Sequence, residues 1–213
     1  MSPEQTAPKR NYQKELERRI EQFQREDRVP RLLLHSCCAP CSSYVLEYLS
    51  EYFDITIFYY NPNITDPKEY RKRADEVRRL ISELPVTHPI SFMEGDYEPH
   101  VFTEAARGLE HEPEGGARCG RCFRLRLEKT AQAAARIAEE LNEEILFTTT
   151  LTISPLKNAE LINSIGQEVA DKYDGAVWLD SDFKKRNGFK RSIELSRQYG
   201  LYRQDYCGCV YSK

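Results

Sequence analysis

A chain of 213 residues that is 40% hydrophobic and 31% charged, with a net charge of −3, has the composition of one globular domain, which excludes disordered and fibrous classes. No apolar run reaches the roughly 18 residues of a membrane span, and the N-terminal 20 residues lack the apolar segment of a secretory signal. We therefore expect a cytoplasmic protein. Its slightly acidic balance argues against gross electrostatic binding of nucleic acid, but leaves local basic patches open.

The spacing of apolar residues predicts helices and strands that alternate along the chain. An N-terminal helix is expected to bury one face, and we interpret residues 1–29 as an extension that docks through it; the face consists of Tyr12, Leu16, Ile20 and Phe23. Strands are expected at 31–35, 54–64, 86–92, 144–153 and 176–180. Pro89 demotes the third of these strands towards a sheet edge.

The helices between these strands are predicted from their capping residues. They are expected from Ser42, from Pro67 behind an Asp66 cap, behind Ser154 and Pro155, and over about 189–199. Residues 118–142 are expected to form a loop that holds Cys119 and Cys122 and runs into a long helix. Strands alternating with helices predict βαβ units, so we expect residues 30–213 to form one α/β domain with a parallel sheet flanked by helices.

Seven cysteines lie in three groups, and their odd number in a reducing compartment argues against a disulfide framework. The groups are Cys37, Cys38 and Cys41; Cys119 and Cys122; and Cys207 and Cys209. The first group follows a strand and opens a helix, where α/β proteins bind ligands and where the helix dipole favours thiolates. Gly208 lets the two sulfurs of the last group turn towards one centre. We expect all three groups to meet at the C-terminal edge of the sheet.

The number and spacing of the thiols favour iron–sulfur chemistry over a structural zinc. Zinc takes four ligands, most often from two C-x-x-C hairpins. This chain has one isolated pair of that form, Cys119 and Cys122, and a second such spacing, Cys38 to Cys41, inside the group of three, so that seven sulfurs exceed one zinc. A 4Fe–4S cluster takes up to four thiolates, which leaves three for part of a second metal site. Buried inert thiols are the least favoured interpretation.

Several longer motifs surround these cysteines. They are "LLLHSCCAPCSS", "YYNPNI" followed by "EYRKR", "RCGRCFRLR", "TTTLTISPLKN" and "DFKKRNGFKRSIELSRQYGLYRQDYCGCVYS". Together they make the stretch from about residue 31 to residue 212 resemble the cobalamin-independent, iron–sulfur epoxyqueuosine reductases. Three cysteine groups in this order with these neighbours are a specific match, and they cover nearly the full domain.

The resemblance implies a Rossmann-like fold similar to the nucleotide α-hydrolases. It also implies reduction of epoxyqueuosine to queuosine at the wobble position of tRNA, the final step of queuosine biosynthesis, with a 4Fe–4S cluster and an adjacent mononuclear iron. All seven cysteines carry over as metal ligands, undivided between the two centres. Related nucleotide-binding folds place Ser and Gly after strand one to hold ATP, and this chain has cysteines there, so ATP is not expected.

The reaction needs a proton donor, for which the sequence offers several candidates near the predicted loops. We favour Asp182, either as the acid or as an oxygen ligand of the second iron, although it can equally pair with Lys184. Tyr206 is a further catalytic candidate. His35 and Asp96 are alternatives, and His35 is equally expected as a satisfied histidine at a strand end.

Two basic runs flank the cysteine segments, where the anticodon loop of a tRNA would pass. The candidate tRNA-binding residues are Arg121, Arg124, Lys184, Lys185 and Arg186, with Arg118, Arg126, Lys190 and Arg191 beside them. Candidates for stacking on a flipped base are Tyr59, Tyr60 and Phe183, and candidates for polar contacts are Thr150, Thr152 and Ser154. A solvated helix face is the plain alternative for the basic runs.

Two other functions remain open on the residues alone. An iron–sulfur tRNA thiolase of the same general fold needs a Ser-Gly-Gly-x-Asp-Ser type loop after strand one, and the sequence lacks that loop. A zinc-stabilised RNA-binding module would also use the basic runs and cysteines. No G-x-G-x-x-G fingerprint for a nicotinamide or flavin is present, so we expect a separate electron donor such as a ferredoxin or flavodoxin.

Overall fold

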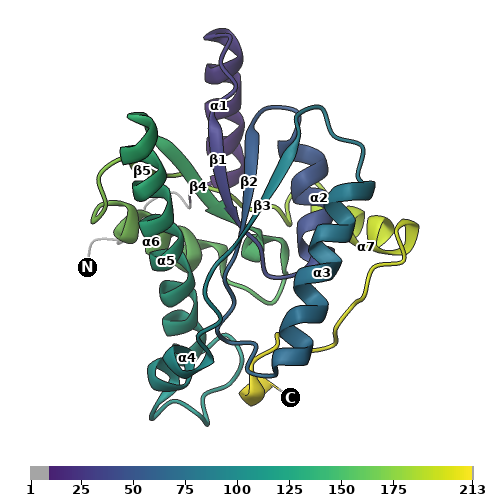
Figure 1. Cartoon of the computed structure of the whole chain (residues 1–213), viewed down its shortest axis with the longest axis vertical. Helices are drawn as coiled ribbons and strands as arrows, with labels where there is room; N and C mark the ends of the chain where they lie inside the picture. The colour runs from purple at the N-terminus through teal and green to yellow at the C-terminus, as the bar shows by residue number, and fades with distance from the viewer. Residues whose placement is uncertain (1–9, 213) are drawn as a thin grey trace, which may run out of the picture.

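The computed structural model describes residues 10–212 and shows a parallel β-sheet covered by helices on both faces (Figure 1). The strand order is β3-β2-β1-β4-β5, and every neighbouring pair is parallel. The strands are β1 (Arg31–His35), β2 (Asp54–Tyr59), β3 (Ile90–Glu94), β4 (Ile145–Thr149) and β5 (Ala176–Trp178). The predicted Rossmann-like α/β class is therefore confirmed, and β3 lies at the edge that Pro89 indicated.

Two apolar clusters fill the two sides of the sheet. The helices α1, α2 and α3 contribute to one cluster, and α5 and α6 contribute to the other. The helices are α1 (Tyr12–Arg25), α2 (Ala39–Leu49), α3 (Pro67–Glu83), α4 (Pro99–Ala106), α5 (Ala117–Leu141), α6 (Ala159–Ala170) and α7 (Gly188–Gln198), with two 3-10 turns, η1 (Thr150–Ile153) and η2 (Val210–Ser212). No helix within residues 10–212 is both long enough and apolar enough to span a membrane.

Helix α1 packs its apolar stripe against the sheet domain, as its spacing predicts. Leu16, Ile20 and Phe23 are buried, and the Phe23 ring meets Phe53 edge-on at 6.0 Å between centroids. Asn11 caps the helix by accepting from the backbone N–H of Lys14. The helix thus docks on the core, while the division at residues 29 and 30 stays a prediction.

Three predicted helix starts are wrong, and all lie beside the cysteine segments. Helix α5 begins at Ala117, so Cys119 and Cys122 lie inside it rather than in a loop before it. Helix α2 begins at Ala39 rather than Ser42, because Pro40 is compatible with the first helical turn, where no backbone N–H partner is needed. Helix α6 is capped by Asn158, whose Oδ1 accepts from two backbone N–H groups, rather than by Ser154 with Pro155. Ser154 instead ends the 3-10 turn η1.

Three strands end earlier than predicted, and one is shifted. Strand β5 stops at Trp178 rather than at residue 180, and β3 covers Ile90–Glu94 rather than 86–92. Strand β2 stops at Tyr59 and β4 stops at Thr149. The Thr149 hydroxyl accepts from the backbone N–H of Leu151 and so turns the chain into η1. From β1 the sheet continues in opposite directions, to β2 on one side and β4 on the other, and this switch point forms a crevice at the carboxyl ends of the strands. The first cysteine loop lies in that crevice.

Candidate metal centre

Three cysteine sulfurs converge at the carboxyl end of β1. Cys38 is the N-cap of α2, Cys41 lies in the first turn, and the sulfurs of Cys37, Cys38 and Cys41 are all within 4.8 Å of one another. The Cys37 backbone N–H donates to Thr150 Oγ1 at 3.3 Å, which ties this loop to the end of β4 across the switch point. We name these three residues the cysteine trio.

The three thiols of the trio differ in acidity. The thiols of Cys38 and Cys41 donate to the Cys37 sulfur and hold the pKa of Cys37 well below its ordinary value, with further help from Lys157 and Thr150. The contact with Cys37, together with burial, raises the pKa of Cys38 to about 12. The contacts with Cys37 and Cys38, together with burial, raise the pKa of Cys41 well above its ordinary value. A bound cation would release the remaining protons, as metal binding to thiols does.

The other four cysteines surround a second pocket. Cys119 and Cys122 lie on the first turns of α5, and Cys207 and Cys209 lie on the C-terminal tail. All four line one pocket, together with Arg118, Arg126 and Lys157 among others. Burial raises the pKa of Cys122 to about 12. We name Cys119, Cys122, Cys207 and Cys209 the four-cysteine pocket.

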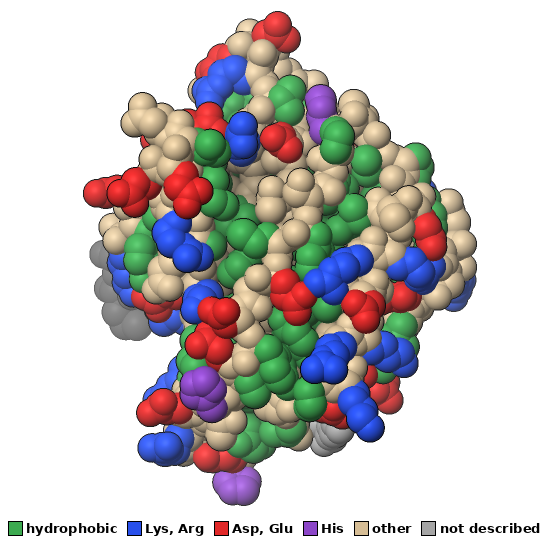
Figure 2. Space-filling view, viewed as in Figure 1, with side chains coloured by type: hydrophobic (Ala, Val, Ile, Leu, Met, Phe, Trp, Pro, Cys, Tyr) green, Lys and Arg blue, Asp and Glu red, His purple; other side chains and the backbone are tan. Residues whose placement is uncertain are grey.

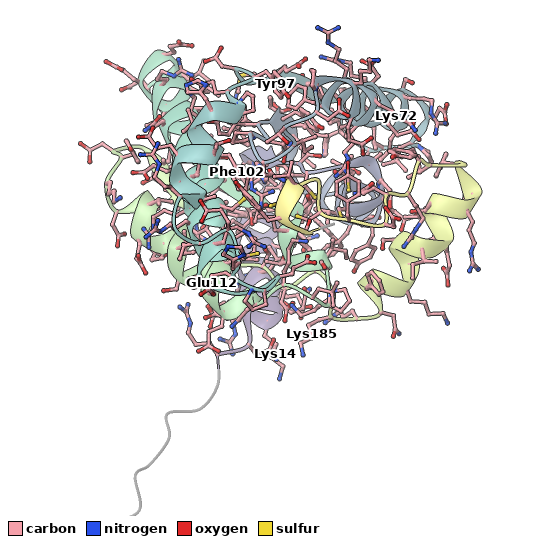
Figure 3. The ribbon with its side chains drawn as sticks, turned by 90° about the horizontal axis from the view of Figure 1, so that it is seen from below. Lys14, Lys72, Tyr97, Phe102, Glu112 and Lys185 are labelled. Atoms are coloured by element: carbon pink, nitrogen blue, oxygen red, sulfur yellow. The ribbon has the colours of Figure 1, made fainter. Side chains whose placement is uncertain are left out.

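The C-terminal tail is held in place by buried arginines. Arg73 donates to the Cys207 carbonyl at 3.2 Å and pairs with Glu69 at 2.7 Å, and Arg118 donates to the Tyr211 carbonyl at 3.3 Å. Gly208 has a φ of +98°, which residues with a side chain rarely adopt. This agrees with the prediction that a glycine is needed between the two cysteines. Seen from below, the tail crosses the molecule between the helices that carry Phe102 and Lys72, with sulfur atoms beside it (Figure 3).

The two cysteine groups adjoin. Cys41 of the trio and Cys207 of the four-cysteine pocket both line a third pocket of about 230 Å³, with Asp205 and Tyr206 on its wall. Lys157 lines both pockets, and the sulfurs of Cys207, Cys37 and Cys41 raise its pKa although burial opposes the charge. All seven cysteines are free thiols. The C-terminal edge of the sheet thus gathers every thiol of the chain.

The family of the chain follows from comparison with known sequences. The model of the family described as epoxyqueuosine reductase QueH matches residues 32–213. The chain belongs to this family. It is 43% identical to "Epoxyqueuosine reductase QueH" of Streptococcus pyogenes serotype M1 over 214 residues, which cover 100% of the chain and 80% of the relative. It is 44% identical to the protein of that name from Staphylococcus epidermidis over 206 residues, which cover 95% and 84%.

The match to a more distant relative covers most of both chains. "Epoxyqueuosine reductase QueH" of Thermotoga maritima is 35% identical over 184 residues, which cover 85% of the chain and 89% of the relative. The family is one of oxidoreductases, which does not favour the thiolase or the zinc-stabilised binding module. The family match spans both cysteine groups.

Asp182 lies at a different opening from the cysteines. Its carboxylate is 2.7 Å from the Lys184 ammonium, which is the pairing anticipated as its plain alternative. It lines a pocket with Lys157, Lys185 and the first residues of α6, and no cysteine lines that pocket. Tyr206, in contrast, shares a pocket with Cys41 and Cys207, and the Arg73 guanidinium lies 5.2 Å from the centre of its ring.

His35 is a satisfied buried histidine, and Asp96 lies elsewhere. The His35 Nε2–H donates to the Tyr60 carbonyl at 3.1 Å, because that oxygen only accepts, and Nδ1 then accepts from the Thr149 hydroxyl at 2.8 Å. Burial, with the nearby Arg126 charge, lowers the pKa of His35 to about 3, so the ring is neutral at pH 7. Asp96 is exposed and lines a groove of about 910 Å³ that contains no cysteine.

Most candidate tRNA-binding residues have partners on the protein. Arg124 pairs with Glu168, Lys184 with Asp182 and Arg186 with Glu17. Arg121 donates to the Ala105 carbonyl, and Lys185 is exposed with no ion pair within residues 10–212. Figure 2 shows basic and acidic side chains interleaved over one face rather than a surface of one sign.

Several residues proposed for RNA contact are buried and do not reach the surface. Arg118 and Arg126 are each 1% exposed. The stacking candidates Tyr59, Tyr60 and Phe183 are buried, as are Thr150 and Thr152. The hydroxyls of Thr152 and Ser181 share a hydrogen bond of 3.1 Å. These side chains build the walls of the crevice from inside.

Three cations lie beside the sulfurs. Arg73 and Lys157 are not among the residues predicted from the sequence, and Arg126 is predicted there as a tRNA contact rather than as a neighbour of the cysteines. The available signal was helical spacing. Arg126 lies four residues after Cys122, so the two side chains share one face of α5.

Proposed function

We propose that this chain catalyses the two-electron reductive deoxygenation of epoxyqueuosine to queuosine at the wobble position of tRNA, the last step of queuosine biosynthesis. The observation that carries the proposal is the convergence of seven free thiols at the switch point of the sheet in a member of this reductase family. A disulfide or structural role does not explain seven free thiols in adjoining pockets.

We further propose a division of the metals that the sequence left undecided. Thiolates bonded to one ion at about 2.3 Å lie at most about 4.6 Å apart, and the trio sulfurs lie within 4.8 Å of one another. The trio therefore suits a mononuclear iron. The four cysteines of the second pocket suit a 4Fe–4S cluster, whose four irons place its thiolates farther apart.

The reaction converts the epoxide and two electrons and two protons into an alkene and water. The metals supply single electrons and a Lewis acid for the epoxide oxygen when bound. The pocket of about 230 Å³ between the two cysteine groups is the proposed site for the epoxide-bearing ring. In it, Asp205 and Gln204 offer polar groups to the hydroxyls of that ring.

We propose Tyr206 as the proton donor to the released oxygen. Its phenol lines the same pocket as Cys41 and Cys207, and the Arg73 guanidinium over its ring fixes its position. Asp182, the other candidate, is bound to Lys184 and lines a pocket without a cysteine. The geometry therefore favours Tyr206, and it gives Asp182 no support as an iron ligand.

For the tRNA we keep the exposed basic residues around the site as the proposed contacts. Arg121 and Lys185 are exposed, whereas Arg124, Lys184 and Arg186 must exchange a carboxylate for a phosphate. Such exchange is inexpensive for Arg124 and Arg186 at the surface, where an ion pair contributes about 0–1 kcal/mol, whereas Lys184 pairs with the buried Asp182. A one-electron donor of the ferredoxin or flavodoxin class completes the proposal, and a tRNA substrate places the enzyme in the cytoplasm.

The test is the metal content and activity of anaerobically purified protein. About five irons and four sulfides per chain, a reducible cluster by electron paramagnetic resonance, and conversion of epoxyqueuosine in tRNA are expected. One zinc per chain without sulfide after anaerobic reconstitution would contradict the proposal and restore the binding module. Iron and sulfide without turnover of the tRNA would refute the substrate alone.

A further inference from the structure

Three arginines are among the largest fully buried side chains of the protein, and all three lie around the C-terminal tail. Two of them are well compensated. Arg73 pairs with Glu69 at 2.7 Å and donates to the Cys207 carbonyl. Arg118 donates to the carbonyls of Leu109, Glu110, Glu112 and Tyr211, at 2.5 to 3.3 Å.

Arg126 has the fewest compensating contacts of the three arginines. Like Arg118, it has no carboxylate within 4 Å in the described part of the chain, and like both others it has one buried guanidinium nitrogen without a hydrogen-bond partner, its Nη2. Unlike them, its guanidinium donates a single hydrogen bond within the described residues. Its Nε–H donates to the Cys122 carbonyl at 3.3 Å, which is a neutral partner. A buried charge without an opposite charge costs several kcal/mol in a folded protein, so such a residue requires another source of negative charge.

The surroundings of Arg126 identify that source. Its side chain lines the four-cysteine pocket with Cys119, Cys122, Cys207 and Cys209. The sulfurs of Cys122, Cys207, Cys37 and Cys119 raise its pKa, although burial opposes the charge. Among the buried residues of the described part of the chain, the one acidic side chain is Asp182, which pairs with Lys184. The negative charge opposite Arg126 can therefore come from the cysteine thiolates and from a metal cluster that they bind.

We propose that Arg126 is a positioning residue that supplies the internal counter-charge of the four-cysteine pocket, stabilising the iron–sulfur centre bound there and raising its reduction potential. The inference rests on the proposed function, because it takes the pocket to hold a cluster. A cluster with thiolate ligands carries net negative charge, and reduction adds one more negative charge. A fixed cation beside it favours the reduced form, since net charge and burial are among the determinants of cluster potentials.

The experiment is an anaerobic redox titration of the full chain with its metals bound, followed by the electron paramagnetic resonance signal of the reduced cluster. Arg126→Met removes the charge and keeps the length, and Arg126→Lys keeps a charge. Arg124→Met is the matched control, two residues earlier on α5 and paired with Glu168 at the surface. Iron and sulfide are counted for each variant first.

At the wild-type midpoint, Arg126→Met is expected to hold at least tenfold less reduced cluster relative to oxidised cluster. A tenfold change corresponds to a shift of about 59 mV to more negative potential for one electron. Arg126→Lys should recover most of the shift, and Arg124→Met should titrate like the wild type. A fully loaded Arg126→Met with the wild-type midpoint would overturn the inference.

A second measurement covers the case in which Arg126→Met fails to retain the cluster. The thermal midpoint of the full chain is compared before and after metal removal by a chelator. A counter-charge predicts that Arg126→Met is at least as stable as the wild type without metal, and that Arg126→Lys still binds the cluster. Equal destabilisation of Arg126→Met with and without metal would show a purely structural role and refute the inference.

The same samples separate this inference from the proposed function. Wild-type protein that takes up neither iron nor sulfide would refute the proposed function, whatever the variants do. Wild-type protein that binds the cluster and turns over the tRNA, with no change of potential in Arg126→Met, would refute the role of Arg126 alone.

Discussion

The cysteine trio and the four-cysteine pocket are built in different ways. The trio comes from one short segment, at the end of β1 and the start of α2, and its sulfurs lie within 4.8 Å of one another. The four-cysteine pocket joins the start of α5 to a tail more than 80 residues later in the chain. Local structure alone positions the trio, whereas the pocket depends on the docking of the tail.

Because of this difference, the two proposed metal centres should fail separately. A local motif at a helix N-terminus stays in place as long as β1 and α2 are folded. The tail has little regular structure beyond η2, and it is held by Arg73, Arg118 and the conformation of Gly208. Changes that release the tail should therefore remove the cluster first.

The largest expected effect separates the two groups by metal content. Cys122→Ser should lose about four irons and the four sulfides of a 4Fe–4S cluster, because it removes a buried ligand of the pocket. Cys37→Ser should lose about one iron and keep the sulfide. Both variants should lose activity, and iron and sulfide counts per chain distinguish them. Loss of all iron and sulfide in Cys37→Ser would refute the proposed division.

The second effect tests the clamp on the tail. Arg73→Ala leaves Glu69 without its 2.7 Å partner and removes the hydrogen bond to the Cys207 carbonyl. We expect it to lower the free energy of unfolding by about 4 kcal/mol, as removal of one partner of a buried pair does. Denaturant unfolding measures the loss, and Arg71→Ala, on the exposed face of the same helix, should be near neutral. Full cluster content in a folded Arg73→Ala would show that the tail needs no clamp.

The third effect tests the conformation between the two tail cysteines. At Gly208 an added Cβ would lie 2.8 Å from the side chain of Ile64, on a backbone with a φ of +98°. Gly208→Ala should cost about 2–3 kcal/mol through strain and crowding. Gly200→Ala is the control, because its φ of +55° is also positive but no atom lies within 4 Å, so about 1 kcal/mol is expected. Equal losses in the two variants would remove the role assigned to crowding.

The smallest effect lies away from both cysteine groups and concerns pH. Burial raises the pKa of Asp180 from 3.8 to about 6, against the pull of Arg10. The folded state then binds the proton more tightly than the unfolded state, so stability falls as pH rises from about 4 to 6.

Asp180→Asn removes this dependence. We expect the free energy of unfolding of the variant to match that of the wild type at pH 4. At pH 7 it should exceed the wild-type value by less than about 1 kcal/mol, because the site is partly solvated. Thermal unfolding at the two pH values measures the difference. The exposed Asp174→Asn should show no such difference between the two pH values. A wild type that gains stability from pH 4 to 6 relative to Asp180→Asn would contradict the assignment.

The parallel α/β architecture and the location of the trio could be predicted from the sequence. Apolar runs alternate with helices of clear period, and Cys37, Cys38 and Cys41 follow a buried strand directly, so local rules place them at the carboxyl edge of the sheet. The need for glycine between Cys207 and Cys209 was also readable, because residue type and φ are local properties.

Only the tertiary structure decided which cysteines share a pocket and which basic residues are buried. Arg126 belongs to a run of arginines that reads as a solvated face, yet it lies under the returning tail, whereas Arg124 is on the surface. Side-chain caps also set element ends that the sequence pattern misplaces. Thr149 ends β4 before its apolar run ends, and Asn158 rather than Ser154 caps α6. Long-range packing sets burial and charge compensation, and no local pattern encodes the position of a tail 80 residues away.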